Sequence, residues 1–128
     1  MGKIERFEDI EAWMKARKLT GEIYRYTRGG PFGKDFGLRD QIRRSAVSVM
    51  ANVAEGFGRK TNKDFAHFLY TAKSSAMEVI SHLYVALDQE YIDKEKFASL
   101  KEGYEHTQRM LVNLIRYLES HPRSRSKP

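Results

Sequence analysis

The sequence is marked first by what it lacks. It contains no cysteine, which excludes disulfide bonds, thiol catalysis and thiolate-bound zinc. Proline occurs only at positions 31, 122 and 128, so no proline interrupts a helix between the first two of these. No apolar run approaches the roughly 18 residues that a membrane-spanning helix needs, and the charged N-terminal stretch does not resemble a signal peptide. These absences predict a cytoplasmic protein that does not use a membrane.

The 128 residues are enough for one domain with a hydrophobic core, since 41% of them are hydrophobic and 12% are aromatic. We assign residues 1–120 to that domain and residues 121–128 to a disordered basic tail. The formal net charge is +6, and the positive excess lies in residues 1–73, which hold 15 basic and 9 acidic residues. This distribution suits a polyanionic partner, or self-association between a basic and an acidic half; an unevenly charged, solvated surface is the plainer interpretation.

Helical periodicity runs through four segments, and no alternating strand pattern competes with it. The expected helices cover residues of about 9–28, 36–57, 62–89 and 94–120. Gly29, Gly30 and Pro31 form a stop signal after the first helix, and Thr61 with Asp64 resembles a capping box that opens the third. Four long helices on short connections predict an all-α fold, an antiparallel up-and-down four-helix bundle.

Each expected helix carries an apolar stripe at intervals of three and four residues, as a core-facing helix should. In the helix 94–120 the stripe is unbroken: Phe97, Leu100, Tyr104, Thr107, Leu111, Leu114 and Leu118. In the helix 36–57 the core side of a helical wheel holds Leu38, Ile42, Ala46, Val49 and Val53. In the helix 62–89 the stripe includes either His82 or Leu83.

The opposite side of the helix 36–57 is small and uncharged, which is unusual for a helix that faces water. Val47, Ala51 and Ala54 lie where an exposed bundle helix normally carries lysine and glutamate. We therefore expect this side to contact another copy of the chain. The expected oligomer interface comprises Val47, Ser48, Ala51, Asn52, Ala54 and Glu55, with the serine and asparagine hydrogen-bonding across the contact. An exposed helix of good propensity that tolerates alanine is the alternative.

Glu55 is the carboxylate of most interest, because it follows Ser48 and Asn52 on one helix stripe and stands one turn before Arg59. We expect these groups to form a buried network that fixes the register of the interface. A role as a catalytic base is the alternative, but no second catalytic group lies within reach in the sequence.

Three stretches resemble the small four-helix-bundle proteins encoded in intervening sequences of bacterial large-subunit ribosomal RNA genes. They are FEDIEAWMKARKL (7–19), FGLRDQIRRSAVSVMANVAEGFGRKTNKDFAHFLYTAKSSAME (36–78) and EYI (90–92), and the most specific part runs from Asn52 to Arg59. The resemblance implies an up-and-down bundle that assembles as a ring-like homo-oligomer, a pentamer. It also implies an association with RNA or ribosomes.

Three positions depart from the pattern of that family. Met50 stands where proline is usual, and Ser74 and Glu90 stand where glycine is usual. The absent proline predicts a straighter second helix.

Basic residues bracket the helix 36–57 and the turn that follows it. This basic set comprises Arg39, Arg43, Arg44, Arg59, Lys60 and Lys63. Arg39 and Arg43 stand four residues apart and share a helix face, so they can contact adjacent phosphates. In an oligomer the set repeats around the symmetry axis and forms a large positive surface. We predict that structured RNA binds there; pairing with nearby carboxylates (Asp40, Glu55 and Asp64) is the alternative.

Aromatic residues near the basic set, Phe32, Phe36 and Phe57, either stack on exposed bases or, more simply, close the ends of the core. The four histidines are scattered and form no metal-binding pair, so no metal or cofactor is predicted. Arg116 and His121 match the Arg-x4-His spacing that resembles the motif of HEPN-type ribonucleases, in which histidine handles a proton and arginine stabilises phosphate charge. His121 falls at a helix end before Pro122, a poor place to hold that geometry.

Taken together, the residues predict a non-enzymatic homo-oligomeric bundle that binds structured RNA, without cofactor or small-molecule substrate. The resemblance implies that this RNA is ribosomal RNA or part of a ribonucleoprotein. An oligomeric protein-interaction scaffold that does not bind nucleic acid is the main alternative. Metal-independent RNA cleavage is a remote one.

Overall fold

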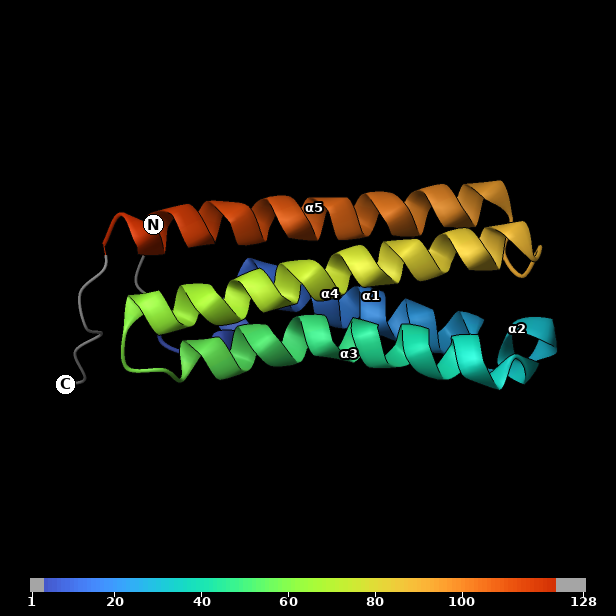
Figure 1. The fold of residues 1–128 in the computed structure, drawn as a ribbon, viewed down its shortest axis with the longest axis horizontal. Coiled ribbons are helices and arrows are strands. Elements are labelled where there is room, and N and C mark those ends of the chain that lie inside the picture. The colour runs from blue at the N-terminus through green and yellow to red at the C-terminus, as the bar shows by residue number, and fades with distance from the viewer. Residues whose placement is uncertain (1–3, 122–128) are drawn as a thin grey trace.

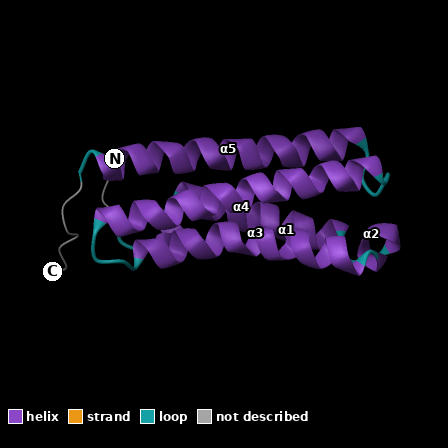
Figure 2. Ribbon diagram, in the orientation of Figure 1, coloured by secondary structure: helices purple, strands orange, loops and turns teal. Residues whose placement is uncertain are grey.

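The computed structural model describes residues 4–121, and within that range the regular structure is helical (Figures 1 and 2). A 3-10 turn (η1, Phe7–Asp9) precedes the helices. The helices are α1 (Glu11–Tyr26), α2 (Gly30–Lys34), α3 (Phe36–Phe57), α4 (Asn62–Asp88) and α5 (Lys94–Glu119). The predicted tail begins at His121, and its residues 122–128 lie outside the described part of the chain.

The four long helices pack side by side as an up-and-down bundle, with α3 between α1 and α4, and α5 against both α4 and α1 (Figure 1). One end of the bundle, the α2 end, holds α2 and the turn from α4 to α5. The opposite end, the Thr61 end, holds the turn from α3 to α4 and the last turn of α5. The prediction of an all-α bundle is therefore confirmed, while the oligomeric state stays a prediction.

The core is built from the predicted apolar stripes. On α5, every stripe residue from Leu100 to Leu118 is buried and Phe97 is partly buried. On α4 the stripe includes Leu83, which is fully buried, and His82 lies half-buried beside it. Tyr104 is enclosed on all sides, and burial raises the pKa of its hydroxyl, so that it stays neutral in the core.

The bundle helices approach closely where glycine replaces a larger residue. A Cβ atom built on Gly56 of α3 would lie 2.7 Å from Cβ of Phe68 and 3.2 Å from the carbonyl oxygen of Phe65, both on α4. A Cβ atom on Gly103 of α5 would lie 2.6 Å from Cδ2 of Leu19 on α1. Gly56 sets the α3–α4 spacing, because its neighbours on α4 are a Cβ atom and a backbone oxygen that cannot turn aside, whereas a side chain at Gly103 would require the end of Leu19 to shift.

Two of the expected boundaries need correction: the start of the first helix and the segment that follows it. The first helix begins at Glu11 rather than at residue 9, since the preceding residues form the separate turn η1. The segment 29–37 does more than stop that helix, because Gly30 at φ 66° and Pro31 open the short helix α2. Phe32 of α2 is buried and stacks on Tyr91 with 5.2 Å between ring centroids, which fixes α2 against the turn from α4 to α5.

Helix termini are capped as the sequence indicates. Thr61 accepts a hydrogen bond from the backbone N–H of Asp64 at 3.0 Å, and Asp93 accepts one from Lys96 at 2.7 Å. The helix α3 continues through Met50 without interruption, in agreement with the missing proline. No helix in residues 4–121 is both long enough and apolar enough to cross a bilayer.

The turn from α4 to α5 places Glu90 in the left-handed region, at φ 61°. The N–H of Tyr91 donates to the carbonyl of Ala86 at 2.8 Å, and the N–H of Glu90 donates to that of Leu87 at 3.0 Å. This pair of bonds is the Schellman arrangement that ends a helix, and glycine is the usual residue at its left-handed position. Glu90, which stands where glycine is usual, therefore occupies a position whose left-handed backbone favours glycine.

Candidate nucleic-acid interface

The basic set does not form one patch, because its members lie toward opposite ends of α3. Arg39, Arg43 and Arg44 lie on α3 toward the α2 end, whereas Arg59, Lys60 and Lys63 follow α3 at the Thr61 end. The axis of α3 runs about 20 Å from Arg44 to Phe57, since a helix rises about 1.5 Å per residue, and Arg59 lies beyond that end. The sequence could show only that these residues flank the helix.

Arg43 is engaged with the C-terminus of α1. Its Nε donates to Oγ1 of Thr27 at 2.8 Å, and its Nη2 donates to the carbonyls of Thr27 at 3.3 Å and of Tyr24 at 3.5 Å. The guanidinium also lies 4.4 Å from the centroid of the Tyr24 ring. Arg43 thus donates to the carbonyls at the end of α1, where the carbonyl of Tyr24 also accepts from Thr27, and this is a structural role.

Arg39 and Arg59 also have partners within the chain. Arg39 donates to Asp40 at 2.9 Å and to the carbonyl of Gly33 at 3.2 Å, with its guanidinium over the Phe36 ring. Arg59 donates to Glu55 at 3.1 Å, and its guanidinium lies over the Phe68 ring. Pairing with carboxylates, the alternative for these arginines, is therefore what the structure shows at both positions.

Arg44, Lys60 and Lys63 differ from the other three members of the basic set. All three side chains are exposed, and none makes a hydrogen bond or an ion pair within residues 4–121. An exposed cation without a protein partner loses little on exchanging water for a phosphate oxygen. These three residues are the part of the basic set best suited to bind a polyanion.

The middle of the outer face of α3 is small and apolar, as the sequence indicates, and it lies between the exposed charges of Arg44 and Glu55. Val47 is 40% exposed, Ala51 is exposed, and Ala54 is partly buried. This face has no covering element in the described chain, so it remains available for a subunit contact.

Ser48 and Asn52 lie on the side of α3 that is next to α4. Ser48 Oγ shares a hydrogen bond of 2.9 Å with Oγ of Ser75, and Asn52 Nδ2 donates to the carbonyl and to Oγ of Ser48 at 2.8 and 3.0 Å. The bond between Ser48 and Ser75 joins α3 to α4, and the bonds of Asn52 hold Ser48 in place within α3.

Within the single chain, Glu55 does not join Ser48 and Asn52 in a buried network. Its side chain is 58% exposed and pairs with Arg59. At 100° per residue, position 55 lies about 60° farther from the core side than Asn52, which carries its carboxylate out of the α3–α4 contact.

Of the three phenylalanines near the basic set, two close the core and one does not. Phe32 is buried, and Phe57 packs edge-on against Phe65 with 6.0 Å between centroids. Phe36 is 63% exposed, with Arg39 across its face.

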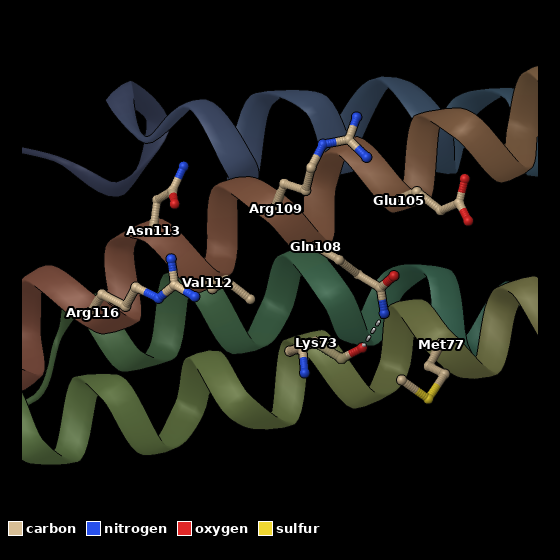
Figure 3. A pocket seen from close by; sticks show the side chains of 8 residues that line it. All are labelled: Lys73, Met77, Glu105, Gln108, Arg109, Val112, Asn113 and Arg116. Carbon is tan, nitrogen blue, oxygen red and sulfur yellow. Dashed lines mark hydrogen bonds between the residues drawn. The ribbon is translucent and has the colours of Figure 1, made fainter.

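An open groove of about 570 Å³ lies between α4 and α5, on the far side of the bundle from the α1–α3 contact (Figure 3). It is lined by Lys73, Met77, Glu105, Gln108, Arg109, Val112, Asn113 and Arg116. Gln108 bridges the two helices by donating to the carbonyl of Lys73 at 3.3 Å. The sequence does not predict this groove, because its residues come from two helices and belong to neither apolar stripe; only Arg116 stands out in the sequence, and for a different reason.

No hydrogen bond joins the side chains of Arg116 and His121 in residues 4–121. His121 lies beyond the end of α5, where its ring stacks on Tyr117 at 4.4 Å and its Nδ1 lies 2.8 Å from the carbonyl of Tyr117. Arg116 lines the α4–α5 groove. Among the described residues, no group of three or more potential metal ligands comes together.

Comparison with known proteins gives one family and one structural relative of note. The model of the family described as 23S rRNA-intervening sequence protein matches residues 8–113. A crystal structure from Bacteroides thetaiotaomicron, of a protein of unknown function from the S23 ribosomal protein family, superimposes with a TM-score of 0.75 at 25% sequence identity. The match covers 82% of this chain and 98% of that one. None of the curated proteins matches the sequence.

Proposed function

Because the chain belongs to the 23S rRNA-intervening sequence protein family, we propose that it is a non-enzymatic homo-oligomeric bundle that binds structured RNA, with ribosomal RNA as its partner. The names of the family and of its structural relative associate such bundles with the ribosome and its RNA. The observation that carries the proposal is the set of exposed cations without protein partners, Arg44, Lys60 and Lys63. Their contacts would be to phosphates and therefore largely independent of sequence.

Oligomerisation strengthens this proposal in a quantitative way. Two or three phosphate contacts from one chain give weak binding, but a ring repeats them in every subunit at a high effective concentration. With about 6 to 10 phosphate contacts in total, affinity should fall roughly 10³- to 10⁵-fold between 50 and 200 mM salt. The small outer face of α3 supports such an assembly.

The test is filter binding of a structured ribosomal RNA fragment over that salt range. The double variant Arg44→Glu, Lys60→Glu should lose binding, because each substitution replaces a phosphate contact with a repulsive charge. The control Lys18→Glu, Lys94→Glu makes the same change in net charge on exposed residues elsewhere and should retain most of it. Absence of binding by the natural protein even at 50 mM salt would instead favour a protein-interaction scaffold.

A further inference from the structure

The α4–α5 groove is positively charged, and its charge is not neutralised within the chain. Lys73, Arg109 and Arg116 line it and make no ion pair in the part of the chain that the structure describes. Its one carboxylate, Glu105, lies 3.3 Å from Nζ of Lys101 and raises the pKa of that lysine through a hydrogen bond. The groove therefore presents three cations to one carboxylate that is already paired, which suits a chain of negative groups.

The spacing of these cations suits an extended ligand. Arg109 and Arg116 are seven residues apart on α5, so they lie on one face about 10 Å apart along the axis. Figure 3 shows Arg109, Asn113 and Arg116 on α5, with the side chains of Arg109 and Asn113 pointing away from α4, and Lys73 and Met77 across the groove on α4. A flexible polyanion can run along this line and meet one cation after another.

Two exposed aromatic rings lie on α4 near the cations. Tyr70 and Tyr84 are 47% and 46% exposed, and Met77, midway between them at intervals of seven residues, is 57% exposed. The hydroxyl of Tyr70 donates to Oε2 of Glu119 at 3.0 Å, and the ring of Tyr84 packs edge-on against Phe97 at 4.7 Å. These contacts hold each ring in place while leaving much of its surface open for stacking.

The groove leads toward two residues of the basic set. Lys63 lies seven residues before Tyr70 and on the same face of α4. The Thr61 end is closed by a hydrogen bond from Asn62 to the carbonyl of His121, which brings the start of α4 to the end of α5. A ligand leaving the groove past Arg116 therefore approaches Lys63 and Lys60.

We propose that the α4–α5 groove binds a single-stranded segment of RNA, with Lys73, Arg109 and Arg116 on its phosphates and Tyr70 and Tyr84 stacking on its bases. Cations along a groove combined with exposed aromatic faces are the usual means of binding single strands. This inference rests on the proposed RNA binding. It adds that the RNA is single-stranded and that the α4–α5 groove binds it. A duplex presents its phosphates but keeps its bases stacked inside, so it cannot use the tyrosines.

The test is fluorescence anisotropy with a labelled oligouridylate of about 12 nucleotides, a length within the range of known single-strand sites. The variant Arg109→Gln, Arg116→Gln should weaken binding about 10- to 100-fold at 50 mM salt. It should also make the slope of log affinity against log salt shallower by about 1.4, since two phosphate contacts are lost. The control Lys18→Gln, Lys94→Gln, with the same loss of charge, should leave both quantities unchanged.

Stacking is tested separately with Tyr70. Tyr70→Leu should weaken binding of the oligouridylate about fivefold or more without changing the salt slope, while Tyr70→Phe, which keeps the ring, should bind like the natural protein. Circular dichroism melting checks that each variant folds, and the surface positions of Arg109 and Arg116 predict no large change.

Two outcomes would overturn the proposal without touching the broader function. One is binding of the structured ribosomal fragment with no binding of the oligouridylate at 50 mM salt. The other is a change in sedimentation of Arg109→Gln, Arg116→Gln, which would identify the groove as a contact between subunits or with a protein. If neither RNA binds, the proposed function fails as well.

Discussion

Glu90 has a backbone conformation that suits its side chain poorly. It occupies the left-handed position of the turn after α4, where a residue with a Cβ atom costs roughly 1–2 kcal/mol relative to the right-handed conformation and glycine has no such cost. Its carboxylate makes no hydrogen bond or ion pair with the described residues that would offset this cost.

Glu90→Gly should therefore raise the free energy of unfolding by about 1 kcal/mol. Chemical denaturation at a fixed protein concentration measures the change. Glu102→Gly, at an exposed position inside α5, is the control and should lower stability by about 1 kcal/mol. Equal losses in the two variants would show that the left-handed backbone at Glu90 carries no strain.

Gly56 is a second residue whose size matters. Gly56→Ala should lower the free energy of unfolding by about 1–3 kcal/mol, because the new methyl group would lie 2.7 Å from Cβ of Phe68. Gly21→Ala is the control: a Cβ atom at this position of α1 would meet no other atom within 4 Å, so alanine should raise stability by up to about 1 kcal/mol. Thermal melting of both variants measures the change. An unchanged melting temperature of Gly56→Ala would mean that α3 and α4 can move apart at that point without loss of stability.

At the scale of the element, a residue of α3 caps the C-terminal end of α1. The carbonyls of Tyr24 and Thr27 accept from Arg43, a residue of the next long helix. The end of α1 and the start of α3 are therefore stabilised together, although α2 and its flanking residues separate them in sequence.

Arg43→Met keeps much of the side-chain volume and removes the donors, so it should lower the free energy of unfolding by about 2 kcal/mol. Arg44→Met changes the exposed neighbour and should stay within about 0.5 kcal/mol of the natural protein. Urea titration of both variants provides the comparison. If Arg43→Met is as stable as Arg44→Met, Arg43 is free to serve a ligand instead.

The elements also show which parts of the structure could be read from the sequence. Long helices repeat their pattern over many turns, so the core stripes of α3 and α5 could be predicted residue by residue. The five-residue α2 is too short to show a period, and its Gly-Pro opening has the composition of a break. Periodicity also identifies which side of a helix is buried but not which outer residues of two helices meet, so it does not predict the α4–α5 groove.

The candidate site shows the same limit at the level of single residues. Spacing placed Arg39 and Arg43 on one face, which is correct, but it could not show that carbonyls at the ends of α1 and α2 would take their donors. Likewise, a stripe drawn through Ser48, Asn52 and Glu55 assumes one direction for all three, whereas only the first two face α4. Tertiary contacts decide such cases, and a single sequence does not contain them.

At the scale of the whole molecule, the proposed assembly depends on the outer face of α3. Val47→Glu with Ala51→Glu should reduce the proposed oligomer to a monomer of about 15 kDa, because two charges would be buried in the contact. Val85→Glu with Ala98→Glu makes matched substitutions at exposed positions on α4 and α5 and should leave the oligomer intact. Sedimentation at micromolar concentration distinguishes the two. A natural protein that sediments as a monomer would contradict the assembly.

The proposed RNA binding would depend on the length of the RNA, because the exposed cations Arg44 and Lys60 lie toward opposite ends of α3. An RNA too short to span the roughly 20 Å of helix between Arg44 and the end of α3 would reach the cations at one end only, whereas a longer one would bridge both. Bridging makes the second contact intramolecular, so affinity should rise in a step as RNAs of increasing length pass that span. The bundle would then select its ligands by size before any base is read.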